Sequence, residues 1–210
     1  MARNIALIGF GESGKQFFGF LKNKSDRFVF FDDTLPKENN PDFFSFHDYG
    51  QQQFSGFDFF VSLGYHHLKK KKNIIEHLLK LGRNVPAFHH STSFINPTAS
   101  LGAGTFIFPM CNIDKEVKTG KGVLLNNSVC ISHNNIIGDC CYIAPGVITS
   151  GFVEIGNETF IGTGTVISND IKIGNNVTVG AGAVITKDIP DNCSVAGNPF
   201  RILDKPLRLK

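Results

Sequence analysis

Residues 143–173 read IAPGVITSGFVEIGNETFIGTGTVISNDIKI, in which an aliphatic or Thr residue recurs at every sixth position. The same spacing runs unbroken from Ile95 to Ile185. A period of six suits neither an amphipathic helix nor a hairpin, but it suits a short strand and a tight corner, repeated. The stretch therefore predicts a β-solenoid. The series is Ile95, Leu101, Ile107, Ile113, Thr119, Leu125, Ile131, Ile137, Ile143, Thr149, Ile155, Ile161, Ile167, Ile173, Val179 and Ile185.

Glycines repeat with a second, longer period in the same region. Gly102, Gly120, Gly138, Gly156 and Gly174 are eighteen residues apart, the length of a three-sided coil made of three hexads. Glycine tolerates the positive φ that a sharp corner demands. Each inward side chain should pack on its counterpart one coil away, at the strand spacing of about 4.8 Å. We predict a parallel β-helix of about five coils without an inserted loop.

The N-terminal part alternates strands and helices. Strands are predicted at 4–10, 28–31, 57–63 and 84–88, and helices at 15–21 and 67–81. The loop 9–14 reads GFGESG, and the second strand ends in Asp32 and Asp33. Strand, glycine turn, helix, strand and acidic end form a dinucleotide-type signature, in which the helix N-terminus favours an anion. The alternative is a tight connection that binds no ligand.

Chain length limits what this first part can bind. The 210 residues suffice for two small domains. We predict a Rossmann-like α/β half-domain over 1–92, a β-helix over 93–190 and a C-terminal tail over 191–210. Because half of a doubly wound fold offers too little surface for NAD, a mononucleotide fits better.

Composition excludes several classes of function. The net charge of +3 implies no strong field for nucleic acid or a membrane. The sequence contains no run of eighteen apolar residues, so we expect no membrane helix. The N-terminus does not resemble a signal peptide. The five cysteines form no CxxC pair, so we expect no metal site. These features predict a cytoplasmic protein.

His133 is the only one of the seven histidines inside the hexad repeat. It occupies neither the aliphatic position nor the fifth position of its hexad, so its side chain should point outward. Gly151 follows one coil later in the same column, leaving room beside the imidazole and placing a backbone N–H nearby. A base and an amide donor are two parts that acyl transfer requires. Either Asn134 or Asp139 could accept a hydrogen bond from one ring nitrogen and leave the other as the base.

Other reactive residues have simpler interpretations. Cys141 falls on an inward position and Cys140 has no nearby cation, so a cysteine nucleophile is disfavoured. The lysine run 69–72 is interpreted as a solvated helix face. His66 or His67 beside it could face a ligand at the end of the third strand.

The order of motifs resembles the nucleotide-sugar acetyltransferases of the PglD/NeuD type, which include PglD, PerB and VioB-like sugar N-acetyltransferases. The resemblance covers nearly the whole chain and implies a left-handed β-helix, a homotrimer and acetyl-CoA as donor. The motifs are IGFGESG at 8–14, FFDD at 30–33, FFVSLG at 59–64, ISHNNIIGD at 131–139, APG at 144–146, IGTGTVI at 161–167, VGAGAVITKDIP at 179–190 and AGNPFRIL at 196–203.

The resemblance also implies roles for single residues. His133 matches the catalytic base, and Asn134 stands where many members carry an acidic residue. Gly151 matches the glycine whose amide meets the thioester, and Tyr142 stands where some members carry a histidine near it. Further contacts with coenzyme A are implied for Thr163, Ala181 and Lys187. The implied nucleotide-sugar site comprises Gly9, Phe10, Gly11, Ser13, Asp32, Asp33, Leu63, Gly64 and Tyr65.

The predicted reaction is N-acetylation of a nucleotide-linked 4-amino-deoxy sugar, with UDP or dTDP as the carrier, for surface-polysaccharide or O-antigen assembly. His133 would take a proton from the attacking amine, and the Gly151 N–H would stabilise the oxyanion. O-acetylation of a sugar such as a sialic acid needs the same base and remains the alternative. A non-catalytic trimeric scaffold and an NAD oxidoreductase are weaker alternatives.

Overall fold

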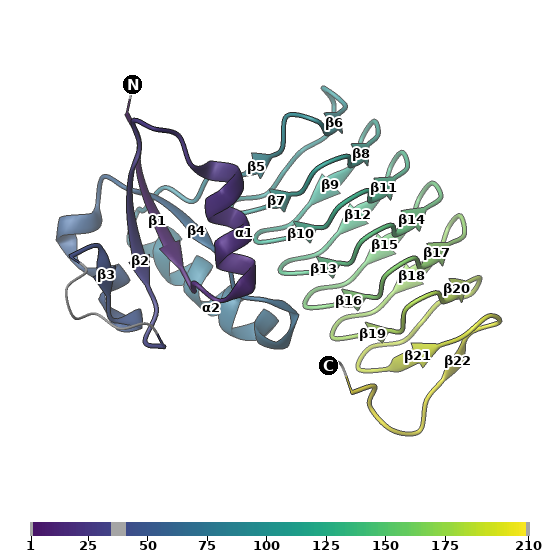
Figure 1. Cartoon of the computed structure of the whole chain (residues 1–210). Coiled ribbons are helices and arrows are strands. Elements are labelled where there is room, and N and C mark those ends of the chain that lie inside the picture. The colour runs from purple at the N-terminus through teal and green to yellow at the C-terminus, as the bar shows by residue number, and fades with distance from the viewer. Residues whose placement is uncertain (1, 35–40, 209–210) are drawn as a thin grey trace. The chain divides into compact units, whose positions relative to one another are not determined.

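The computed structural model describes residues 2–34 and 41–208, which form two compact units that meet between Pro86 and Ala87. Unit 1 is an α/β fold and unit 2 is a β-solenoid (Figure 1). This confirms the predicted fold class. The boundary lies six residues earlier than the predicted one at 92/93, because the solenoid begins before the first recognisable hexad.

Unit 1 contains a four-stranded parallel sheet in the order β3-β2-β1-β4, here called sheet A. The strand β3 was not predicted, and of the predicted strand 84–88 only Asn84 joins this unit's sheet, through an isolated bridge to Asp58, whereas Phe88 begins β5 of unit 2. The elements are β1 (Asn4–Ile8), α1 (Glu12–Leu21), β2 (Arg27–Phe31), β3 (Phe43–Phe44), the short 3-10 helices η1 (Phe46–Gly50) and η2 (Gln52–Phe54), β4 (Asp58–Val61), the 3-10 helix η3 (Tyr65–His67) and α2 (Leu68–Lys80).

The helix α2 corrects one sequence-based interpretation. The lysine run was expected to be a solvated face, yet Lys71 is only 1% exposed. It shares the buried side of α2 with Ile74, Ile75 and Leu78, three, four and seven residues further on. Residues at these spacings lie on one helix face, so position 71 faces the core and its aliphatic stem is buried there.

The solenoid has three sheets, each of which collects one strand from every coil, with the corners between them. Sheet B contains β5 (Phe88–His89), β7 (Phe106–Ile107), β10 (Leu124–Leu125), β13 (Tyr142–Ile143), β16 (Phe160–Ile161), β19 (Thr178–Val179), β21 (Ser194–Ala196) and β22 (Arg201–Ile202). Sheet C contains β6 (Phe94–Ile95), β8 (Asn112–Ile113), β11 (Cys130–Ile131), β14 (Ile148–Thr149), β17 (Val166–Ile167) and β20 (Val184–Ile185). Sheet D contains β9 (Lys118–Thr119), β12 (Ile136–Ile137), β15 (Glu154–Ile155) and β18 (Lys172–Ile173).

The parallel pairing confirms the predicted register. Ile131, for example, pairs with Ile113 on one side and Thr149 on the other, each eighteen residues away. From Ile107 to Val195 the second residue of each strand points inward, and all of these residues except Thr119 and Thr149 belong to one continuous apolar core. Cys111 and Cys141 are buried in it, as their inward positions predicted.

Both ends of the solenoid differ from the expectation. The solenoid has about six turns instead of the predicted five, and β5 precedes the first predicted hexad, which begins at Ile95 in β6. Near the other end the spacing shortens, because Ile189 bridges Ile173 only sixteen residues away. β21 then continues sheet B within the region assigned to the tail, and β22 runs antiparallel beside it.

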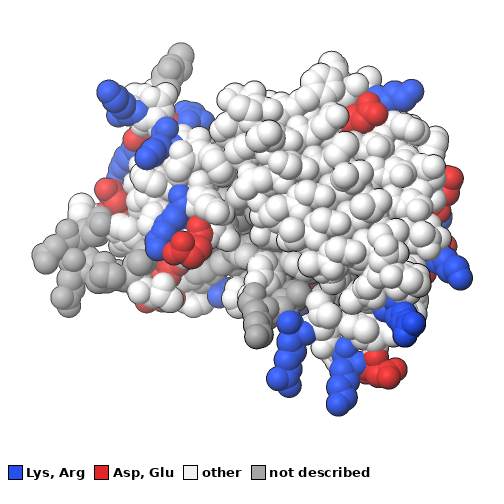
Figure 2. All heavy atoms as spheres, turned by 45° about the vertical axis from the view of Figure 1, so that its right-hand side comes forward, with Lys and Arg blue, Asp and Glu red and all other residues white. Residues whose placement is uncertain are grey.

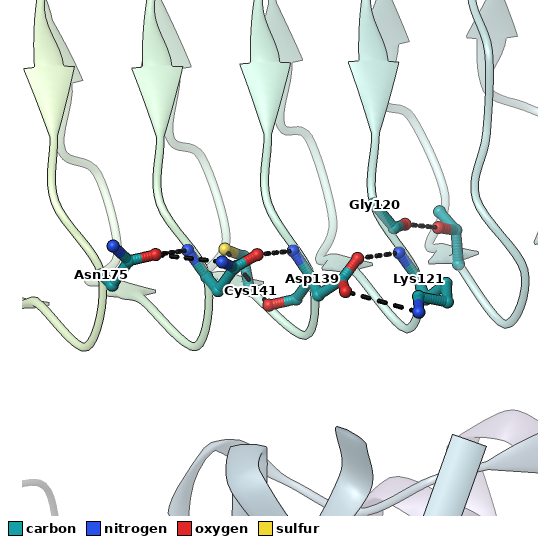
Figure 3. A network of polar contacts seen from close by, with 7 residues as sticks. Gly120, Lys121, Asp139, Cys141 and Asn175 are labelled. Atoms are coloured by element: carbon teal, nitrogen blue, oxygen red, sulfur yellow. Dashed lines mark hydrogen bonds and ion pairs between the residues drawn. The ribbon is translucent and has the colours of Figure 1, made fainter. Parts of the chain in front are cut away.

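Side-chain amides and carboxylates also tie the coils together at the corner between sheets D and B. Asp139 Oδ1 accepts the Lys121 backbone N–H at 2.8 Å, and Asp139 in turn donates its N–H to Asn157 Oδ1 at 2.7 Å (Figure 3). Asn175 Oδ1 accepts the next backbone N–H, that of Asn157, at 2.8 Å. The ladder satisfies amides that the corners leave outside the sheet hydrogen bonds.

Candidate active site

His133 lies at the corner between sheets C and D, in the tight turn that joins β11 to β12. Its ring is partly exposed, as predicted for an outward position. Nδ1 of His133 is 3.1 Å from Oδ1 of Asn134. Because an amide oxygen can only accept, this contact puts the ring proton on Nδ1 and leaves the lone pair on Nε2.

Asp139 was the other residue considered as the partner of His133. Its carboxylate instead accepts the Lys121 N–H and lies 3.7 Å from the Lys121 Nζ, so it belongs to the ladder at the corner between sheets D and B. The structure therefore selects Asn134 as the residue that orients the imidazole.

Gly151 provides the room that the sequence predicted beside the imidazole. A Cβ built on Gly151 would lie 2.5 Å from Cε1 and 2.8 Å from Nε2 of His133. Such distances are far below van der Waals contact, so any larger residue would push the ring away. The imidazole consequently lies over the Gly151 backbone, one coil further along the solenoid.

The backbone N–H of Gly151 corrects the expectation that this amide is free. It donates to Oδ1 of Asn169 at 2.9 Å. Asn169 stands one coil beyond Gly151 in the same column, and its side chain is exposed. Sequence analysis did not consider Asn169, although the eighteen-residue spacing from Gly151 was a usable signal.

Phe152 forms an aromatic wall beside the imidazole, and sequence analysis missed it. Its ring meets the His133 ring edge to face at a centroid distance of 5.2 Å, and the residue is 52% exposed. Its φ of 58° lies in the left-handed region, which is unfavourable by about 1–2 kcal/mol for a residue with a Cβ. The same φ recurs eighteen residues apart at Glu116, Asn134 and Asp170, so it belongs to this corner of the solenoid, and what distinguishes Phe152 is its exposed ring beside the imidazole.

The remaining residues implied to contact coenzyme A lie along the two edges that border sheet C. Thr163 and Ala181 are exposed at the corner between sheets B and C. Lys187 is exposed at the other edge, in the turn that follows β20. The structure therefore does not bring Thr163 or Ala181 next to His133 within one chain.

Tyr142 lies on the outward face of sheet B, whereas His133 occupies the opposite corner of the three-sided coil. Its hydroxyl accepts a hydrogen bond from Nδ2 of Asn126 at 3.0 Å, and its ring stacks on Phe160. Gly151, which lies beside His133, and Tyr142 are the two residues that the resemblance placed near the thioester, and within one chain they are on different sides of the solenoid.

The cysteines offer no activated thiol at this site. Burial raises the pKa of the Cys141 thiol to about 12. Its Sγ donates to the carbonyl oxygen of Gly156 inside the solenoid. Cys140 is also completely buried. This agrees with the expectation that neither residue is a nucleophile.

In unit 1 the predicted substrate residues converge at the carboxyl edge of sheet A, where α/β folds bind ligands. The loop after β1 approaches the loop after β4, because a Cβ built on Gly9 would lie 2.9 Å from Cδ2 of Leu63. The Oγ of Ser13, at the start of α1, would lie 3.6 Å from a Cβ built on Gly64. A Cβ built on Gly11 would have no neighbouring atom within 4 Å, so there is open space at the N-terminus of α1. Tyr65 follows in η3 and is partly exposed.

The two aspartates after β2 hold this edge together. Asp32 accepts the Phe10 N–H at 2.6 Å and both the N–H and the hydroxyl of Thr34. Partial burial opposes ionisation of Asp32, but these hydrogen bonds outweigh it and lower the pKa of the carboxyl below its ordinary value. Asp33 accepts hydrogen bonds from Ser45 and from the backbone of Phe46. Contact of either carboxylate with a substrate stays a prediction.

Metal-binding clusters and membrane-spanning helices are absent from residues 2–34 and 41–208. These residues contain no cluster of three or more His, Cys, Asp or Glu residues that could hold a metal ion. None of their helices combines the length and the apolar character that crossing a membrane requires.

Comparisons with known proteins agree with this geometry. Residues 152–187 match the family described as bacterial transferase hexapeptide (six repeats). The acetyltransferase domain of PglB from Neisseria gonorrhoeae is 30% identical, with a TM-score of 0.86 over 96% of this chain and 100% of that one. The chain belongs to the sugar N-acetyltransferases of the PglD/PerB type. It is therefore an acyltransferase.

Other solved structures show how widely this family shares the two-unit fold. The PglB domain has also been solved in complex with acetyl coenzyme A. WeeI from Acinetobacter baumannii is 26% identical, with a TM-score of 0.78 over 97% of this chain and 100% of that one. PerB from Caulobacter crescentus, solved with CoA and GDP-perosamine, is 20% identical, with a TM-score of 0.86 over 97% and 98%. At that identity PerB shows the shared fold alone.

Proposed function

We propose that this member of the family transfers the acetyl group of acetyl-CoA to the amino group of a nucleotide-linked 4-amino-deoxy sugar. The observation that carries the proposal is the His133 imidazole, whose Nδ1 contacts Asn134 while Nε2 lies beside Gly151. An imidazole held in this way can accept a proton from an attacking amine. The acetyl group of a thioester is already activated, so no covalent enzyme intermediate is required.

The proposed acceptor site is the carboxyl edge of sheet A. The open space at Gly11 and the N-terminus of α1 suit a phosphate group. Asp32 and Asp33 beside it are the proposed contacts of the ribose or base, with UDP or dTDP as the carrier. We infer that the product serves surface-polysaccharide or O-antigen assembly in the cytoplasm.

We propose that the active form is a homotrimer with sheet C facing the threefold axis. The outward residues of sheet C include no Lys, Arg, Asp or Glu, whereas sheet D presents Lys118, Glu154 and Lys172. Phe94, Ile148 and Val166 of sheet C are each at least 39% exposed. Figure 2 shows a broad face of the solenoid with charged residues only at its margins. An apolar face of this kind marks a contact surface.

This arrangement would also assemble the active site. Both edges of sheet C carry predicted coenzyme A contacts: Gly151 and Lys187 lie on the edge that holds His133, and Thr163 and Ala181 lie on the other. In a ring of three, one edge of each chain meets the opposite edge of its neighbour. Tyr142, on sheet B next to the second edge, would reach His133 of a neighbour although it cannot reach its own. Each cleft would therefore combine two chains.

The substrate class is tested by measuring free thiol release from acetyl-CoA against UDP-, dTDP- and GDP-linked 4-amino sugars. We expect release with at least one of them, and acetyl-CoA and that nucleotide sugar should bind in calorimetric titrations while NAD should not. Thiol release with a sialic acid but with no nucleotide sugar would favour the alternative, O-acetylation. Absence of release with every acceptor would contradict the proposal.

Replacing the proposed base should slow catalysis without disturbing the fold. We expect His133→Ala to lower kcat by about 10²–10⁴-fold, the usual contribution of a positioned base. The partly exposed ring makes no core contact, so the unfolding temperature should change little. A matched control is His90→Ala, which removes another partly exposed histidine of unit 2, whose Nδ1 lies 2.8 Å from Oγ1 of Thr92. Equal kcat values for the His133→Ala variant and the wild type would remove His133 from the mechanism.

The Gly151 N–H remains the proposed oxyanion donor, provided that it exchanges Asn169 for the thioester oxygen. The Asn169 side chain is exposed, so its release costs only about 0.5–1.5 kcal/mol, the net value of one such bond. We therefore expect Asn169→Ala to keep kcat within a few-fold of wild type, or to raise it. A fall in kcat of about 10²-fold would show that the Asn169 carboxamide is itself the donor.

Mixed trimers test whether two chains build each cleft. His133→Ala and Ala181→Trp alter opposite edges of sheet C, and each variant should be inactive alone. Random co-assembly in equal amounts leaves about one cleft in four with both edges intact, so about a quarter of the activity should return. The double variant in a single chain is the control and should stay inactive. Hybrids without activity would place the whole cleft within one chain.

A further inference from the structure

Asn135 breaks the pattern of the solenoid interior at the corner that carries His133. The fifth position of each hexad points inward, and the equivalents one coil before and one coil after are Val117 and Val153, both fully buried. Asn135 is itself only 1% exposed. A buried amide is unfavourable unless its polar atoms are hydrogen-bonded, so its presence among valines requires an explanation.

The Asn135 carboxamide joins two successive corners. Its Nδ2 donates to the carbonyl oxygens of Ser132 at 2.5 Å and Ser150 at 2.9 Å, with a longer contact of 3.3 Å to that of His133. Its Oδ1 accepts the backbone N–H of Val153 at 3.1 Å. One side chain thus bonds the corner 132–135, which holds the imidazole, to the corner 150–153, which holds Gly151.

Each of the two corners has one residue in the left-handed region, Asn134 with a φ of 59° in the first and Phe152 with a φ of 58° in the second. The groups that Asn135 bonds in the second corner, the Ser150 carbonyl and the Val153 N–H, bracket Phe152 on both sides. The Phe152 N–H also donates to the His133 carbonyl at 3.2 Å. The network therefore holds Phe152 where its ring meets the imidazole.

We propose that Asn135 is a positioning residue for the acetyl transfer proposed above, on which this inference rests. It touches no reacting atom. It acts through the backbones of both corners, so that the His133 ring stays between the Gly151 backbone and the Phe152 ring. A valine at this position would fill the interior as its neighbours do but would remove the side-chain hydrogen bonds between the two corners, leaving the backbone bond from Phe152 to His133.

A buried threonine elsewhere in the solenoid offers a matched control. Thr159 occupies the same inward corner position, is fully buried, accepts the Val177 N–H at 3.1 Å and donates to the Gly174 carbonyl at 2.9 Å. It belongs to the corner between sheets D and B, which carries no proposed catalytic group. A purely structural effect of losing a buried polar side chain should therefore be similar in Asn135→Val and Thr159→Val.

The kinetic test compares these two variants in the full-length protein. We expect Asn135→Val to fold and to bind acetyl-CoA with an unchanged KM, but to lose about 10–100-fold in kcat, because small misplacements of a base are costly. Thr159→Val should keep kcat within about twofold. Asn135→Thr, which can accept the Val153 N–H and donate to one carbonyl, should recover part of the loss. Equal kcat values in the Asn135→Val and Thr159→Val variants would overturn the proposal.

A second readout is independent of any substrate. The Hε1 proton of His133, assigned by its loss in His133→Ala, should carry a ring-current shift from Phe152 in the NMR spectrum of the wild type. Asn135→Val should move this signal toward the position of an unstructured histidine, while Thr159→Val should leave it in place. An unmoved signal in Asn135→Val would refute the positioning role. Failure of the wild type to transfer acetyl groups would instead refute the proposed function.

Discussion

The backbone hydrogen bonds between successive coils determine where every outward side chain lies. Cys130 donates to Val147 at 2.9 Å and Gly138 donates to Ile155 at 2.7 Å, and similar bonds join each coil to the next. A slip of one residue would turn an entire row of isoleucines outward, so the buried core keeps this register. The position of His133 over Gly151 follows from the same constraint, because both residues occupy equivalent places in neighbouring coils.

In the solenoid, the residues that stabilise the fold point inward, and the proposed catalytic residue His133 points outward. Inward positions are aliphatic or carry small polar side chains with satisfied hydrogen bonds, such as Thr159. Most outward corner positions are partly or fully exposed and accommodate residues of different chemistry. The column with His133, Gly151 and Asn169 illustrates this variety. Three chemically different residues stack there on a nearly constant backbone.

Much of this arrangement could be predicted from the sequence because the repeat length is constant, at six residues for each strand and corner and eighteen for each coil. The inward series, the outward direction of His133 and the room at Gly151 all follow from counting in sixes and eighteens. The same counting could have placed Tyr142 half a coil from His133, and it could have shown Asn135 as a polar break in an inward column. The strands of unit 1 were also recognisable, apart from β3, which contains only Phe43 and Phe44.

Other features depend on side-chain conformations that no spacing reveals. The bond between the Gly151 N–H and Asn169 exists because one exposed amide adopts one rotamer among several. The choice of Asn134 over Asp139 depends on Lys121, which engages the aspartate from an adjacent coil. Burial of Lys71 follows from the rotation of α2 against sheet A, which the lysine run itself does not encode.

The antiparallel strand β22 has a consequence for the end of the stack. A parallel solenoid could add coils indefinitely, since each terminal strand exposes the same unpaired groups as the one beneath it. β22 occupies the edge of β21 in the reverse direction, with Val195 opposite Ile202 and Ala196 opposite Arg201. Because β22 occupies this edge, a second copy of the chain cannot pair a parallel strand with β21. The strand thereby covers the edge of β21 with a chain direction that the stacked coils do not share.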